Sequence, residues 1–244
     1  MQAANFWNKL YLHRAKIILL AFFLITSMVH AQSFRWAWSN NPNYDDRKLT
    51  YGFLIGLLTT NYQIEYSDKF ITSDFDTLHS VIPDWRPGFS LGFIVNYRIS
   101  EFVDLRLTPE VAFYEHKLKY LFTDGTFVEE LVETTMVEFP LLLKYKSMRR
   151  GNIRMYMIGG IKPGIEASGK KAIKNTQTSL EVKNLNLNLE AGLGFDLYFP
   201  LFKFSPEIRF SRGIIDVLDN TENKFGQPLR RLNTNTVTVY LLFQ

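Results

Sequence analysis

Residues 184–199 alternate strictly between apolar and polar side chains, and no other stretch restricts the fold as strongly. The odd positions carry Leu, Ala or Phe, and the even positions carry Asn, Glu, Gly, Asp or Tyr. Because successive side chains of a β-strand point to opposite faces, this pattern predicts one strand with an apolar face and a polar face. A bilayer is crossed by about 9–11 tilted residues, so this strand is long enough to span a membrane.

The same alternation recurs along the chain and predicts eight strands. They are expected at residues 49–60, 88–99, 102–114, a segment ending at 145, 152–165, 184–199, 202–210 and 236–243. The connections alternate between short ones at 100–101, 147–152 and 200–201 and long polar ones at 61–87, 115–129, 166–183 and 211–235. Short turns on one rim and long loops on the other are typical of outer-membrane barrels. The sequence therefore predicts an all-β fold, an eight-stranded up-and-down antiparallel transmembrane β-barrel with short periplasmic turns and long extracellular loops.

The first 31 residues have the pattern of a secretory signal peptide. A positively charged start precedes an apolar run at 17–29, and a small-residue site follows at the junction of Ala31 and Gln32. The open alternative is a membrane anchor that stays uncleaved. With cleavage after Ala31, the chain has three expected parts, which are the signal peptide at 1–31, an irregular periplasmic lead-in at 32–48 and an outer-membrane barrel at 49–244.

The charge balance gives no support for a nucleic-acid partner. The chain has a net charge of +4, and residues 1–31 carry three positive and no negative side chains, so removing them lowers the charge to +1. With so small a net charge, a basic surface that binds nucleic acid or anionic lipid cannot be argued from the overall charge of the chain. The sequence has no cysteine, so neither disulfides nor thiol chemistry is available to it.

Two orientations of the barrel wall are open: the apolar face can lie outward in lipid, or inward as in a soluble lipocalin-like barrel. An eight-stranded barrel is only just wide enough for side chains to fill it. The apolar face carries many aromatic rings, including Phe53, Phe93, Phe113, Tyr145 and Phe195. The other face carries small residues, among them Gly52, Gly56, Gly92, Gly160, Gly192 and Gly194. Side-chain volume therefore favours an apolar face in contact with outer-membrane lipid.

The inward face is then expected to hold a network of ion pairs. Its predicted members are Asp104, Arg106, Glu110, Glu138, Lys144, Arg154, Lys162, Glu190, Asp196, Glu207 and Arg209, with Arg98 and Lys203 on the same face. Unpaired buried charges are strongly destabilising, so a near balance of acidic and basic side chains predicts mutual pairing. Such a network is either a structural filling or a path for protons or a solute. The narrow lumen favours filling, and we expect no open pore.

No pattern in the sequence points to catalysis, a cofactor or a bound metal. His79 and His116 are the histidines of the expected mature chain, and no recognisable spacing supplies the three or four ligands that a metal needs. His79 lies beside Ser80 and near Asp76, but neighbours in sequence do not make a catalytic triad. We expect no enzyme activity, no cofactor, no metal and no small-molecule substrate.

Several segments together resemble the PorT family of Bacteroidetes outer-membrane β-barrel proteins. They are NPNYDD at 41–46, GFSLGFIVNYRI at 88–99, VEFPLLLKYKS at 137–147, YFPLFKFSPEIRFSRGI at 198–214 and the closing TVYLLF. The piece EFPLLLKY recurs in many small Bacteroidetes barrels. The lead-in and FKFSPEIR, in this order, are the segments that point to PorT.

The resemblance implies a component of the type IX protein secretion system, needed for export of cargo proteins and, in gliding species, for gliding motility. A filled lumen does not pass a protein, so we expect an accessory or partner-docking subunit rather than the channel. Trp36, Trp38 and Tyr44 in the lead-in are the predicted docking residues for other secretion-system proteins. The open alternative is a structural or adhesive small outer-membrane barrel with no secretion role.

Overall fold

The computed structural model describes residues 39–71, 77–167, 182–219 and 225–244. The chain divides into two compact units, Met1–Asn40 and Asn41–Gln244, and every described strand lies in the second. The expected cleavage junction of Ala31 and Gln32 lies outside the described residues, as do Trp36 and Trp38 of the lead-in.

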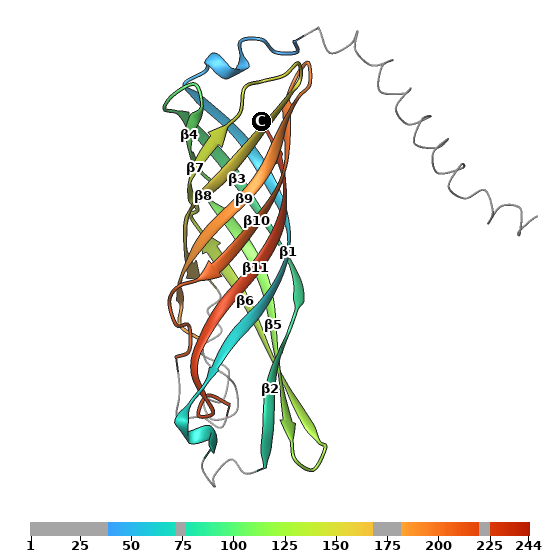
Figure 1. The fold of residues 1–244 in the computed structure, drawn as a ribbon, viewed down its shortest axis with the longest axis vertical. Coiled ribbons are helices and arrows are strands. Elements are labelled where there is room, and N and C mark those ends of the chain that lie inside the picture. The colour runs from blue at the N-terminus through green and yellow to red at the C-terminus, as the bar shows by residue number, and fades with distance from the viewer. Residues whose placement is uncertain (1–38, 72–76, 168–181, 220–224) are drawn as a thin grey trace, which may run out of the picture. The chain divides into compact units, whose positions relative to one another are not determined.

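Eleven strands form one antiparallel sheet in the second unit (Figure 1). They are β1 (Leu49–Tyr66), β2 (Leu78–Asp84), β3 (Arg86–Arg98), β4 (Val103–Leu107), β5 (Glu110–Phe122), β6 (Phe127–Glu138), β7 (Leu141–Lys146), β8 (Ile153–Glu166), β9 (Leu185–Tyr198), β10 (Lys203–Gly213) and β11 (Leu229–Phe243). Two short 3-10 helices, η3 (Tyr44–Asp46) and η4 (Asp68–Ile71), lie before and after β1. Within the described ranges, no helix has the length and apolar character needed to cross a membrane.

The structure has eleven strands where the sequence predicts eight, because two of the expected strands are interrupted and a further strand, β2, lies within the expected loop at 61–87. Only Trp85 separates β2 from β3. Thr108 and Pro109 separate β4 from β5, and Phe139 and Pro140 separate β6 from β7. Proline has no N–H to donate, so it is accommodated where the hydrogen-bond ladder is broken. The eleven strands therefore follow eight paths along the barrel wall.

Each path pairs with a path on either side, so the sheet closes on itself. β1 pairs with β3 on one edge and with β11 on the other, which joins the first strand to the last. β3 pairs with β4 and β5, β5 pairs with β6, and β6 and β7 pair with β8. β2 also pairs with β5, and β4 with β7, while β8 to β11 pair in sequence order. This is an up-and-down barrel, with the turns after β3, β7 and β9 on one rim, the upper end in Figure 1.

The apolar side chains of these paths face outward around the middle of the barrel. Phe93 is 70% exposed, Tyr145 61% and Leu57 58%. Side chains of the opposite parity, such as Leu142 and Lys144, are fully buried. The structure therefore has the outward orientation that side-chain volume predicts, and not the lipocalin-like one.

Two of the four predicted long loops, 61–87 and 115–129, are mostly strand. β1 runs to Tyr66 and β2 begins at Leu78, so residues 67–77 alone connect them. β5 and β6 are joined by the tight turn at 123–126, where Gly125 has a φ of 84°, a left-handed conformation that glycine adopts readily. These extensions continue beyond the rim opposite the short turns (Figure 1).

The prediction of loops is wrong here because the apolar side chains change from the outward face of the strand to the inward face. On β5, Val111 faces outward and Glu110 inward near one end, whereas beyond the middle Leu118 and Tyr120 are buried and Lys117 lies on the outer face. Polar outward side chains over a buried apolar interior are typical of a wall that meets water rather than lipid. The buried apolar cluster inside it contains Tyr62, Leu78, Val81, Leu118, Tyr120, Val132, Val217, Leu218, Leu229 and Leu232.

Candidate functional site

All eleven side chains predicted to form the lumen network are buried in the barrel. Their exposed fractions lie between 0% for Arg106 and Lys144 and 8% for Asp104. They come from β4 to β10, and the alternation of each strand directs them to the inner face. The lumen is thus the largest concentration of buried charge in the described part of the chain, and it is the candidate functional site.

Four charged side chains form a continuous series of ion pairs across the lumen. Arg106 Nη1 lies 2.7 Å from Glu207 Oε2, and Arg209 Nε donates to the other oxygen of the same carboxylate. Arg209 also lies 3.4 Å from Glu190, and the Tyr156 hydroxyl donates to Glu207. Positive and negative groups alternate along this series. Each charge thereby gains the counter-ion without which its burial would be strongly destabilising.

The lumen contains two further ion pairs besides this series. Lys144 Nζ lies 2.7 Å from Asp196, and the Ser205 hydroxyl donates to the same carboxylate at 2.6 Å. Lys162 Nζ lies 3.1 Å from Glu138. All of these residues are at most 1% exposed, so water screens neither ion pair effectively.

Glu110 is bound by hydroxyl groups, whereas the other five predicted carboxylates each contact a lysine or an arginine. The hydroxyls of Ser90 and Tyr240 each donate to Glu110 at 2.8 Å. The five carboxylates that form ion pairs are those of Asp104, Glu138, Glu190, Asp196 and Glu207. Glu110 is therefore part of the lumen network through hydrogen bonds rather than through an ion pair.

Several further groups complete the network beyond the eleven residues that the sequence predicts. Lys146 lies 2.6 Å from Asp104, and it follows Lys144 on the same face of β7. The phenol hydroxyls that bind lumen carboxylates belong to Tyr114, Tyr156 and Tyr240. Strand parity could have identified all of these residues, because each occupies a position of the inward face.

The network occupies most of the lumen. The largest fully buried side chains of the described residues include Arg106, Arg209, Tyr240, Lys144 and Lys162. Toward the extensions, a cavity of about 30 Å³ remains beside Tyr62, Tyr114 and His116, which is room for about two water molecules. An eight-path barrel filled in this way offers no passage for a polypeptide.

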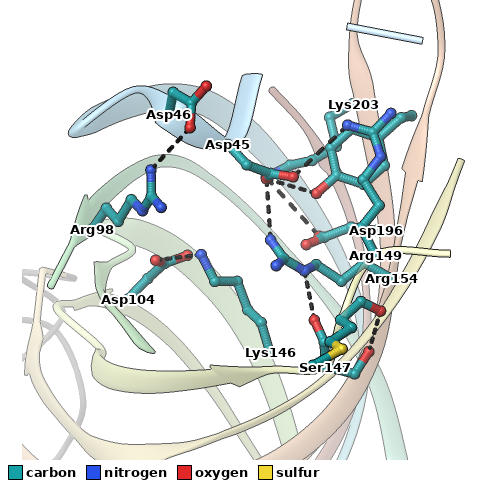
Figure 2. Close-up of polar contacts among 12 residues, drawn as sticks. Asp45, Asp46, Arg98, Asp104, Lys146, Ser147, Arg149, Arg154, Asp196 and Lys203 are labelled. Atoms are coloured by element: carbon teal, nitrogen blue, oxygen red, sulfur yellow. Dashed lines mark hydrogen bonds and ion pairs between the residues drawn. The ribbon is translucent and has the colours of Figure 1, made fainter. Parts of the chain in front are cut away.

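The helix η3 lies at the short-turn rim of the lumen (Figure 2). Asp45 accepts a hydrogen bond from the Tyr198 hydroxyl at 2.7 Å. The same carboxylate lies 3.3 Å from Arg154 and 3.8 Å from Arg149. Asn41 donates from its side chain to a backbone carbonyl of the turn between β9 and β10 at 3.1 Å. These contacts tie residues 41–46 to the barrel rim.

A second set of contacts at the rim involves the neighbouring acidic residue. Asp46 Oδ1 lies 3.4 Å from Arg98, and the Asp46 side chain is 76% exposed (Figure 2). Arg98, which the sequence placed with the lumen network, therefore lies at the rim, because β3 ends at this residue. Lys203, the other residue expected on that face, is buried and lies 4.0 Å from Asp196.

Tyr44, the first residue of η3, is buried against the barrel rather than exposed. Its ring makes an edge contact with Tyr198 at 6.0 Å between ring centroids, and Lys203 Nζ lies 4.7 Å from the Tyr44 ring centre. Burial raises the pKa of the Tyr44 phenol to about 12, so the group is neutral. With 7% of the residue exposed, this ring is not accessible to a partner, and the docking role predicted for Tyr44 does not fit the structure.

We expect Asp45→Asn to loosen η3 while the barrel stays folded. The change removes the charge that faces Arg154 and Arg149, so the free energy of opening η3 should fall by about 1.5 kcal/mol. The backbone amides of Tyr44 to Arg47 should then exchange with deuterium roughly tenfold faster. Asp46→Asn is the matched control, because its single exposed pair contributes little. Equal exchange in the two variants would contradict the assigned role of Asp45.

The two histidines lie in separate environments. His79 is exposed on β2, at an irregularity in the pairing of this strand with β5 between Leu78 and Ser80. Asp76 lies outside the described residues. His116 is buried, and its ring stacks between those of Tyr62 and Tyr114, with centroid distances of 4.1 and 5.8 Å. Within the described ranges, no group of three or more His, Asp or Glu side chains is arranged to hold a metal ion.

The comparison with protein families agrees with a barrel of the outer membrane. The family described as outer membrane protein beta-barrel domain matches residues 30–219. No curated protein matches the chain. Among solved structures, Neisserial surface protein A (NspA) is 10% identical with a TM-score of 0.43, and the match covers 80% of this chain and 98% of that one. OprG from Pseudomonas aeruginosa is 16% identical with a TM-score of 0.43, covering 81% and 94%.

Proposed function

This chain belongs to the outer membrane protein β-barrel domain family, and on that premise we propose that it acts as a non-conducting accessory subunit of protein secretion. The family locates the barrel in the outer membrane. Short turns are typical of the periplasmic rim, so η3 lies on the periplasmic side and the strand extensions lie outside the cell.

The observation that carries the proposal is the filled lumen. Arg106, Glu207, Arg209 and Glu190 form a continuous series of ion pairs across it, and their side chains have no exposed surface. A chain in transit would have to displace these buried charges from their counter-ions, which is strongly unfavourable. The barrel therefore contributes to secretion as an anchor or docking subunit beside a separate channel.

The link to secretion rests on the resemblance to the PorT family. It is carried by the segments at 41–46, 88–99, 137–147 and 198–214. In this proposal the protein supports export of cargo through the type IX secretion system and, in a gliding species, gliding motility. It does so without catalysis and without a cofactor, through other secretion-system proteins that bind it.

Conductance of the purified barrel in a planar bilayer tests the filled lumen. We expect no conductance steps above the background of the bilayer, because the charged side chains leave no continuous water path. An open porin of larger diameter is the positive control. Steady, reproducible channel openings of this protein would overturn the accessory role.

Deleting residues 33–40 tests docking by the lead-in. The deletion removes Trp36 and Trp38 but keeps Asn41, Tyr44 and Asp45, which bind the rim. We expect cargo to stay in the periplasm while the amount of barrel in the outer membrane is unchanged. Normal secretion by this variant would discard the docking role of the two tryptophans.

The secreted proteins of a deletion strain separate the proposal from its alternative. Loss of an accessory subunit leaves cargo trapped in the periplasm. Loss of a structural or adhesive barrel changes envelope integrity or attachment and leaves secretion intact. An unchanged set of secreted proteins would favour the structural or adhesive role.

A further inference from the structure

A hollow of about 440 Å³ opens on the outer surface of the barrel, where β10 separates from β11. β10 ends at Gly213, while β11 continues beside β1. The Asn233 side chain donates to the Gly213 carbonyl at 2.7 Å, and the Arg231 guanidinium donates to the Ile214 carbonyl at 2.9 Å. The hollow is lined by Gln63, Ile64, Glu65, Leu189, Arg212, Gly213, Ile214, Arg231 and Asn233.

The hollow lies at the extracellular boundary of the outer apolar surface. On β10, Ile208 and Phe210 are about half exposed, and Arg212 is the next residue on the same face. Arg212 pairs across the sheet with the exposed Leu189 of β9. A boundary between apolar and polar outward side chains is the level at which lipid headgroups meet a membrane protein.

The charges in the hollow are not balanced. Arg212 Nη2 donates to the neutral Gln63 side chain at 3.1 Å, and Arg231 donates to a backbone carbonyl. Glu65, the acidic residue of the lining, is the cross-strand neighbour of Arg231 and lies 3.6 Å from Arg230, which is outside the lining, so the lining carries two positive charges and one negative charge. Each guanidinium has five N–H donors, so both arginines keep donors for a ligand as well as their positive charge.

From these observations we propose that the hollow binds a phosphate group, and specifically the phosphorylated headgroup of an outer-leaflet glycolipid. Two planar guanidiniums provide forked donors that match phosphate oxygens. Leu189 and Ile214 supply an apolar wall beside them, against which an acyl chain can lie. A free phosphate would use the arginines alone, whereas a glycolipid uses both the charges and the apolar wall.

The test is binding of lipid A to the full-length barrel in detergent, measured by native mass spectrometry. We expect lipid A to bind at least tenfold more weakly to an Arg212→Gln/Arg231→Gln variant, a difference of about 1.4 kcal/mol. Lys119→Gln is the control, because it removes one positive charge from β5 at a position that does not line the hollow. It should bind lipid A as the unchanged protein does.

Further arms distinguish the source of the phosphate. Lipid A without its phosphates should bind weakly and equally to all variants, and inorganic phosphate should not displace lipid A at equal concentration. Undiminished lipid A binding by the double variant would overturn the proposal, as would displacement by inorganic phosphate alone. Circular dichroism checks that the variants are folded. If the double variant is not folded, Arg212→Gln alone is used, since that exposed side chain has a neutral partner.

Discussion

Replacing Glu138 by glutamine should lower the free energy of unfolding of the barrel by about 3–5 kcal/mol. The carboxylate lies 3.1 Å from Lys162 Nζ, and both side chains are 1% exposed. The Tyr114 hydroxyl donates to both carboxylate oxygens at 2.9 Å and accepts from Lys162 at 3.1 Å. Glutamine keeps an acceptor for Tyr114 but leaves the buried ammonium without its bound counter-ion.

The measurement is urea-induced unfolding from lipid vesicles, followed by fluorescence. A Glu138→Gln/Lys162→Met double variant is the control, because it removes the pair and leaves no uncompensated charge. It should recover much of the lost stability, and the difference between the single and double variants gives the coupling of the pair. A loss below about 1 kcal/mol in the single variant would show that the lumen does not depend on this ion pair.

Replacing Gly160 by alanine should cost about 3 kcal/mol, because the two strands around it leave no room for a side chain. Gly160 of β8 lies opposite Leu142 of β7. An added Cβ would overlap the backbone carbonyl of Leu141 and lie 2.9 Å from Leu142 Cα. These are backbone atoms of a paired strand, so relief requires the two strands to move apart and weaken their hydrogen bonds.

Gly159 is the matched control for this prediction. It is the preceding residue of the same strand, and an added Cβ there would be 3.6 Å from its nearest heavy atom, the Glu190 carbonyl oxygen, an ordinary contact. Gly159→Ala should stay within about 0.5 kcal/mol of the unchanged protein. The fraction refolded into vesicles and the urea midpoint provide the comparison. Equal behaviour of the two variants would contradict the close packing of β7 against β8.

The lumen could be predicted in composition but not in pairing. Strand parity places Glu138, Lys162, Glu207 and Arg209 on the inner face, and that requires only the period of two along each strand. The partners depend on the register between strands far apart in sequence. Arg106 and Glu207, for instance, meet across the lumen from β4 and β10.

The extracellular extensions could not be predicted by assuming that the apolar face of each strand points outward along its whole length. Leu118 on β5 and Lys117 beside it continue the same alternation as Glu110 and Val111, but with the apolar residue inward. The exchange follows from the surroundings, which change from lipid to water along a single strand. One strand does not reveal where the membrane ends, so its polar outer side chains have the composition of a loop.

The sequence by itself determined the antiparallel barrel with its eight paths and its outward apolar face, since strand parity and side-chain volume are local quantities. Only the tertiary structure decided that Tyr44 and Asp45 close the periplasmic rim, because their partners Tyr198, Lys203 and Arg154 come from distant strands. It also placed Arg212 and Arg231 around one hollow. A contact between distant residues requires the closed sheet, and the alternation of side chains along one strand does not determine which distant residues meet.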